Sequence, residues 1–151
     1  MYTNILVPLD GSDTSRRGLR EAIALASTTK ATVRLLHVVS DFTPTVDMVS
    51  IAELAIFRSG LHQYGQRLLA TAAAEVRGAD LEVSTALREP ERGRVADAIV
   101  AEAREARCDL VVLGTHGRRG FQRALMGSDA ELVVRESPVP VLVVRAAGAA
   151  S

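Results

Sequence analysis

The chain contains 151 residues, of which 48% are hydrophobic and 24% are charged. This length and balance favour one globular domain and exclude a disordered or collagen-like chain. Eighteen basic residues balance 18 acidic residues, so bulk charge gives no basis for a nucleic-acid or membrane partner.

The cellular location is predicted from features that the sequence lacks. Cys108 is the single cysteine, which forbids an internal disulfide and is typical of a reducing compartment. The apolar run at residues 5–9 is too short for a signal peptide, and no basic residue precedes it. No apolar stretch approaches the roughly 20 residues that a membrane helix needs. We therefore expect a cytoplasmic protein with no membrane partner.

Strand-like and helix-like segments alternate along the chain. Short apolar runs bounded by turns predict strands at residues 5–9, 32–39, 81–87, 109–113 and about 140–144. The segments between them predict a helix that begins after Ser12 and further helices at about 51–76, 95–106 and 128–136.

Apolar stripes support two of these helices. In the first helix the stripe falls at helical spacing, and Ser12 can cap the helix with Asp13 in its first turn; the stripe is Leu19, Ala22, Ile23 and Ala26. The long second helix carries a stripe of Leu61, Tyr64, Leu68, Ala72 and Val76. Gly60 and Gly65 weaken the prediction for its first half, because glycine is a poor helix former.

The alternation predicts a doubly wound α/β fold. Parallel strands with right-handed crossovers place helices on both faces of one five-stranded sheet, for which we expect the order 3-2-1-4-5. Strands one, two, four and five are almost wholly apolar, as strands covered on both faces should be. We assign residues 1–145 to this domain and residues 146–151 to a flexible tail.

Two unusual segments follow strands that this order places side by side. Residues 8–12 follow the first strand, and a glycine-rich loop from Gly114 to Met126 follows the fourth. Ligands of such sheets collect at the carboxyl ends of strands where the strand order reverses. Glycines let backbone amides approach an anion closely, and Arg118 can add a charge-assisted contact to phosphate. By spacing alone, a mobile surface loop with Ser128 as a helix cap explains the same residues.

The spacing of the loop resembles a known signature. Gly114-x2-Gly117-x9-Gly127-Ser128 matches the nucleotide-binding signature of the universal stress protein family, in its ATP-binding branch. Residues 5–12 are similar to the first strand and turn of that family, and residues 109–114 and 137–144 to its fourth and fifth strands. The resemblance extends over residues 3–145, in pattern alone between His37 and Leu81.

The resemblance implies a site for ATP or ADP, with Mg²⁺ as the accompanying ion. Asp10 would contact the ribose or a metal-bound water, and the backbone of Val38 would meet the adenine edge. The other implied contacts are Pro8 and Leu9 with the adenine, Gly114, Thr115, His116 and Gly117 with the ribose and α-phosphate, and Gly127 and Ser128 with the outer phosphates. The implied function is that of a stress-response sensor or regulator with an unknown protein partner.

Asp129 departs from the family pattern, in which an apolar residue such as valine is common. An acid in the first turn of a helix is favourable by itself, by about 0.3–1 kcal/mol. Beside a triphosphate the same charge is repulsive unless a cation bridges the two. Asp129 is therefore counted with the nucleotide site and also supports the alternative, a nucleotide-free interaction module of the same fold.

Other activities are weighed against the motifs that they require. Asp10, His116 and Ser128 lack the G-x-S-x-G elbow of a hydrolase, and the chain has no P-loop and no Rossmann glycine fingerprint after its first strand. Residues 10–13 also do not resemble the serine- and glycine-rich loop of an ATP-consuming transferase or amidating enzyme. Since no general base is identifiable, we do not predict an enzyme beyond weak ATP hydrolysis or self-phosphorylation.

The edges of the predicted sheet bear on assembly. Strand three alternates in polarity, whereas Val139–Val144 at the other edge is continuously apolar. An uncovered apolar edge promotes aggregation. Pairing of this strand with its copy would cover it, and the family resemblance implies the same arrangement, so we expect a homodimer.

Overall fold

The computed structural model describes residues 1–40, 50–90, 92–115 and 125–145. Strands and helices alternate in the order β1 (Asn4–Pro8), α1 (Asp13–Thr29), β2 (Thr32–Val38), α2 (Ile51–Gly78), β3 (Val83–Arg88), α3 (Val95–Glu105), β4 (Leu110–Thr115), α4 (Leu125–Glu136) and β5 (Val141–Arg145). None of the helices in this part of the chain is long and apolar enough to cross a membrane.

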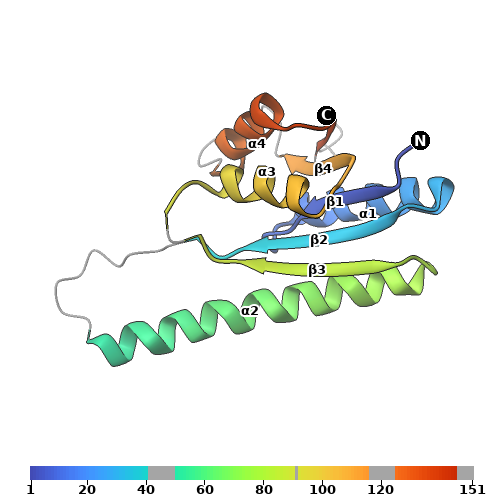
Figure 1. Cartoon of the computed structure of the whole chain (residues 1–151). Helices are drawn as coiled ribbons and strands as arrows, with labels where there is room; N and C mark the ends of the chain where they lie inside the picture. Colours follow the sequence, from blue (N-terminus) through green and yellow to red (C-terminus); the bar gives the residue numbers. More distant parts are fainter. Residues whose placement is uncertain (41–49, 91, 116–124, 146–151) are drawn as a thin grey trace, which may run out of the picture.

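The strands form one parallel sheet in the order β3-β2-β1-β4-β5, which confirms the predicted fold and strand order (Figure 1). Side chains of β1 alternate between its two faces, because successive residues of a strand point in opposite directions. Ile5 and Val7 pack on the side of α1 and α2, whereas Leu6 packs on the side of α3 and α4. The sheet therefore has a hydrophobic core on each face.

α1 begins with the cap that the sequence predicts. The Ser12 side chain accepts a hydrogen bond from the backbone N–H of Ser15, and Asp13 occupies the first turn. The helix ends at Thr29, and its C-cap residue Lys30 has a φ of 60°, in the left-handed region. The buried side chains of α1 include Leu19, Ala22 and Ala26 of the predicted stripe.

α2 is continuous from Ile51, where Ser50 and Glu53 form a capping box, and the glycines do not interrupt it. Its predicted stripe is correct only in the second half. The buried residues are Gly65, Leu69, Ala72, Ala73 and Val76. The first half of α2 extends past the sheet (Figure 1), and Leu61 and Tyr64 are not among the core residues.

α4 begins at Leu125, three residues before the predicted start. Ser128 therefore lies inside the helix, and the interpretation of Ser128 as a helix cap is wrong. Ala130 and Val133 face the core beneath α3 and α4. The tail at 146–151 lies outside the described residues.

A buried carboxylate attaches α3 to the sheet. Glu102 is 1% exposed, and its oxygens pair with Arg34 of β2 at 2.7 Å and with Arg88 of β3 at 2.6 Å. The buried charge is thus fully compensated, as burial of a carboxylate requires. These pairs hold α3 against β2 and β3.

Candidate functional site

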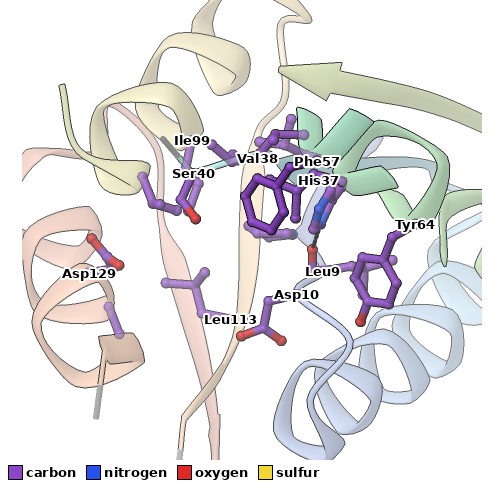
Figure 2. Close-up of a pocket in the computed structure, with 16 residues that line it drawn as sticks. Leu9, Asp10, His37, Val38, Ser40, Phe57, Tyr64, Ile99, Leu113 and Asp129 are labelled. Atoms are coloured by element: carbon purple, nitrogen blue, oxygen red, sulfur yellow. Dashed lines mark hydrogen bonds between the residues drawn. The ribbon is translucent and has the colours of Figure 1, made fainter. Parts of the chain in front are cut away.

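A cavity of about 490 Å³ opens at the carboxyl ends of β1, β2 and β4. The cavity is called the strand-end cavity below. Its walls come from the β1 and β2 ends, from the first half of α2, from α3 and from α4, and Figure 2 shows these side chains pointing into it. Its position is the one expected for ligands of a doubly wound sheet.

The floor of the cavity joins the ends of β1 and β2. His37 Nδ1 lies 2.7 Å from the carbonyl oxygen of Leu9, and the Leu9 N–H lies 2.7 Å from the carbonyl of Leu36. A carbonyl oxygen only accepts, so Nδ1 carries the proton. Pro8, Leu9 and Val38, which the sequence predicts at the site, all line this floor.

Asp10 follows β1 directly and lines the cavity at the turn into α1. Its Oδ1 accepts the backbone N–H of Ser12 at 2.9 Å and also the Ser12 hydroxyl. Ser12 in turn caps α1, so one network orients the carboxylate and the start of the helix. Asp10 thus lines the same cavity as Pro8, Leu9 and Val38, and their contacts with a nucleotide stay a prediction.

Three side chains of α2 form one side of the cavity, called the α2 wall. Phe57, Leu61 and Tyr64 stand at i, i+4 and i+7 and therefore share one helical face. Tyr64 lies edge-on to His37, with ring centroids 6.0 Å apart. A Cβ at Gly11, where φ is +86°, would lie 2.0 Å from the Tyr64 hydroxyl. The absence of a side chain at Gly11 therefore lets Tyr64 reach the β1–α1 turn.

The sequence analysis missed the α2 wall, because it used Leu61 and Tyr64 only as part of the apolar stripe that predicts the helix. The missed signal is the length of α2: 28 residues exceed what the seven residues of β2 can cover. A helix rises 1.5 Å per residue and a strand about 3.3 Å, so 28 helical residues are much longer than seven strand residues. The excess had to extend beyond the sheet, beside the strand ends.

A polar contact ties the α2 wall to the end of β3. Glu89, just after β3, hydrogen-bonds His62 Nε2 and lies 3.4 Å from Arg58 Nε. Arg58 and His62 are spaced i, i+4, so they share one face of the helix beside Phe57 and Leu61. Glu89 thus holds the overhanging part of α2 near the cavity.

α4 supplies the wall opposite to Tyr64. Asp129 and Ala130 line the cavity, and Figure 2 shows Asp129 on the far side from Tyr64. Burial raises the pKa of the Asp129 carboxyl above its ordinary value, although hydrogen bonding from the Ala96 backbone and the charge of Arg94 oppose the shift. Asp129 therefore faces the first turn of α3 as well as the cavity.

The remaining predicted residues have mixed outcomes. Gly114 is buried against α1, where a Cβ would lie 1.9 Å from the carbonyl oxygen of Thr14, so glycine is required there by packing. Thr115 ends β4, and Gly127 and exposed Ser128 lie in the first part of α4. Among the described lining residues, Gly114, Thr115 and Ser128 do not occur. His116, Gly117 and Arg118 lie outside the described residues.

The charge of the strand-end cavity is negative among its described lining residues. Asp10 and Asp129 are its carboxylates, and no lysine or arginine lines it in that part of the chain. Most other lining side chains are aliphatic or aromatic. Within the described ranges, no group of three or more His, Cys, Asp or Glu side chains could hold a metal ion. The cavity therefore suits a planar, mostly apolar group that carries hydrogen-bond donors.

Sequence and structure comparisons identify the family. A model of the universal stress protein family matches residues 1–145. The chain belongs to the universal stress protein family. Universal stress protein MJ0531 of Methanocaldococcus jannaschii is 33% identical over 145 residues, covering 96% of this chain and 83% of that protein. Universal stress protein YxiE of Bacillus subtilis is 32% identical, covering 96% of this chain and all of that protein.

Solved structures of this family have the same fold. A universal stress protein from Burkholderia pseudomallei is 32% identical and superposes with a TM-score of 0.78, covering 96% of this chain and 97% of that one. More distant members carry adenine nucleotides. An Arabidopsis thaliana protein with AMP bound is 17% identical with a TM-score of 0.72, covering 97% and 93% of the two chains. A universal stress protein in complex with cAMP is 24% identical with a TM-score of 0.67, covering 97% and 98%.

Proposed function

We propose that this universal stress protein binds an adenine nucleotide in the strand-end cavity and acts as a cytoplasmic stress-response sensor or regulator. The observation that carries the proposal is the convergence of Pro8, Leu9, Asp10 and Val38 on one cavity of about 490 Å³. That volume lies within the range of small-molecule sites, about 300–1,000 Å³. Distant members of the family with AMP and cAMP bound support the choice of adenine.

The lining of the cavity matches the parts of a nucleoside. The apolar floor and the α2 wall would bury the base, and aromatic rings such as Phe57 would contact its face. The Asp10 carboxylate can accept hydrogen bonds from ribose hydroxyls while Ser12 holds its Oδ1. The phosphates would extend toward Gly114, Thr115, Gly127 and Ser128 and the loop between them, with Mg²⁺ carried on the phosphates.

The first experiment is to denature freshly purified protein and identify any released nucleotide by chromatography and mass spectrometry. Calorimetric titration of the emptied protein with adenosine, AMP, ADP and ATP then measures binding, with guanosine as the control for base selectivity. We expect binding of the adenine series and at least tenfold weaker binding of guanosine, about 1.4 kcal/mol. If no adenine compound binds, the interaction-module alternative replaces this proposal.

The role of Asp10 is tested by two matched variants. Asp10→Asn keeps an oxygen for the Ser12 N–H but removes the charge that strengthens bonds from ribose hydroxyls. Asp13→Asn removes an exposed acid four residues before Arg17 on α1, outside the cavity lining. We expect adenosine affinity to fall about tenfold in Asp10→Asn, by about 1.4 kcal/mol. Affinity unchanged in Asp10→Asn would contradict the assigned ribose contact.

We further propose that the protein is a homodimer through residues 139–144. β5 is an edge strand, and Leu142 and Val143 on it are 38% and 40% exposed. Val134 of α4 is a further exposed apolar side chain, at 53% exposure. An apolar edge that can pair with its own copy favours a symmetric interface.

A further inference from the structure

We propose that Asp129 makes the strand-end cavity select its ligand by phosphate charge, favouring adenosine and AMP over metal-free ATP. The inference rests on the proposed binding of adenine nucleotides and names the class of nucleotide that the site prefers. It follows from where the Asp129 carboxylate lies and from what already occupies the hydrogen-bond donors around it.

Asp129 links the second turn of α4 to the start of α3. It lies in the early part of α4, and the backbone of Ala96, in the first turn of α3, hydrogen-bonds its carboxylate. Free N–H groups and the positive dipole at a helix start ordinarily attract phosphate. At the start of α3 the Asp129 carboxylate already occupies this position, because it accepts the hydrogen bond from the Ala96 backbone. An incoming phosphate would have to compete with a negative charge that is part of the chain.

The neighbouring cation, Arg94, does not cancel the negative charge of Asp129. Arg94 lies close enough to act on Asp129, but its guanidinium also pairs with Asp97 at 2.9 Å and with Glu136 at 3.3 Å. Asp10 adds a second carboxylate to the lining of the cavity. On the α3 and α4 side, the described side chains that a bound phosphate would meet therefore carry a net negative charge.

The repulsion between Asp129 and the ligand grows with the negative charge of the ligand. Adenosine carries no phosphate and has no charge for Asp129 to repel. Each additional phosphate adds negative charge near a partly buried carboxylate, where water screens the repulsion less than at an exposed site. Mg²⁺ bound to the phosphates would cancel most of that charge. We therefore predict a loss of affinity that increases with the number of phosphates and that Mg²⁺ removes.

The test compares Asp129→Asn with the full-length wild type. Asparagine keeps an acceptor for the Ala96 backbone but removes the charge. Glu131→Gln is the matched control, because Glu131 is an exposed acid on the same helix and outside the cavity lining. Affinities for adenosine, AMP, ADP and ATP are measured by calorimetry in EDTA and again with Mg²⁺. Arg118, Arg119 and Arg123 are present in all three proteins, so their contribution cancels in each ratio.

We expect Asp129→Asn to leave adenosine affinity within about twofold and to raise metal-free ATP affinity by about tenfold, with AMP and ADP between them. Mg²⁺ should shrink the ATP gain, and Glu131→Gln should show none. If Asp129→Asn changed the affinities for adenosine and ATP equally, or lowered the affinity for ATP, the selection by charge would be wrong. The proposed nucleotide binding would still stand. Failure of every protein to bind any adenine compound would overturn the proposed function and this inference with it. Asp129→Ser provides the same comparison if the asparagine variant does not fold.

Discussion

His37 donates its Nδ1–H to the carbonyl oxygen of Leu9 across 2.7 Å and so links the ends of two neighbouring strands beneath the cavity. The same ring meets the edge of Tyr64 and lies close to Gly65 on α2. One buried histidine therefore sets both the cavity floor and the distance at which α2 packs. Substitutions along α2 should reveal this dependence.

Gly65 and Gly60 should respond in opposite ways to alanine. A Cβ at Gly65 would lie 2.6 Å from His37 Cδ2 and 2.7 Å from Leu87 Cδ1, whereas nothing lies within 4 Å of one at Gly60. We expect Gly65→Ala to lower the free energy of unfolding by about 1–3 kcal/mol. Gly60→Ala should raise it by about 0.5–1 kcal/mol through better helix propensity. Urea unfolding followed by circular dichroism measures both, and equal effects would contradict the packing difference.

Glu89 should restrain the α2 wall. Glu89→Gln removes the charge that holds His62 and Arg58, so the overhanging turns of α2 should open more often. Hydrogen exchange of amides 57–64 should become about two- to fivefold faster, as expected from loss of an exposed ion pair worth about 0.5–1 kcal/mol. Glu75→Gln, an exposed acid farther along α2, is the control. Unchanged exchange in Glu89→Gln would show that the apolar contacts alone hold the helix.

Asp109 should make stability depend on pH. Burial raises the pKa of its carboxyl, but hydrogen bonds from Asn4 and Thr3 outweigh burial and leave the pKa below its ordinary value. A lowered pKa in the folded state stabilises the protein above the unfolded-state pKa of about 4. This contribution disappears as the pH falls through the folded-state pKa.

Asp109→Asn tests that contribution directly. At pH 7 the free energy of unfolding of the variant should be about 1–2 kcal/mol lower than that of wild type, because the asparagine amide keeps one acceptor oxygen and turns its NH2 group toward donors of Thr3 or Asn4. The difference should shrink as the pH falls below about 4, where the wild-type carboxyl also loses its charge. Glu21→Gln, at an exposed position of α1, serves as the control. A difference that stays constant with pH would assign the effect to geometry and not to charge.

Leu142 should control dimer formation. Leu142→Lys places a charge on the exposed edge of β5, where burial in an interface would be costly, so dimer affinity should fall at least about tenfold. Ile56→Lys changes a 73% exposed residue of α2 and should leave the mass in solution unchanged. Sedimentation velocity at micromolar concentration distinguishes them. A monomeric wild type, or a dimer broken by the Ile56 change, would contradict the β5 interface.

The sheet and most of its helices could be predicted because their causes are local. The alternation of apolar runs with helical stripes, and the turn and cap at Asp10 to Ser12, act within a few residues along the chain. Together they determined the parallel sheet, its strand order and the edge at which a ligand would bind. The placement of Pro8, Leu9, Asp10 and Val38 at one cavity follows from that order.

Only the tertiary structure decided which residues face the cavity and which face the core. Apolar side chains at helical spacing, such as Leu61 and Tyr64, can face either a core or a cavity. These two line the cavity because the first half of α2 lies beside the strand ends. Gly114 looks like part of a phosphate loop but is required by the carbonyl of Thr14, which lies 100 residues away in sequence. The partner of Asp129 on α3 is likewise remote in the chain. Such contacts depend on distances between elements, which local sequence patterns do not encode.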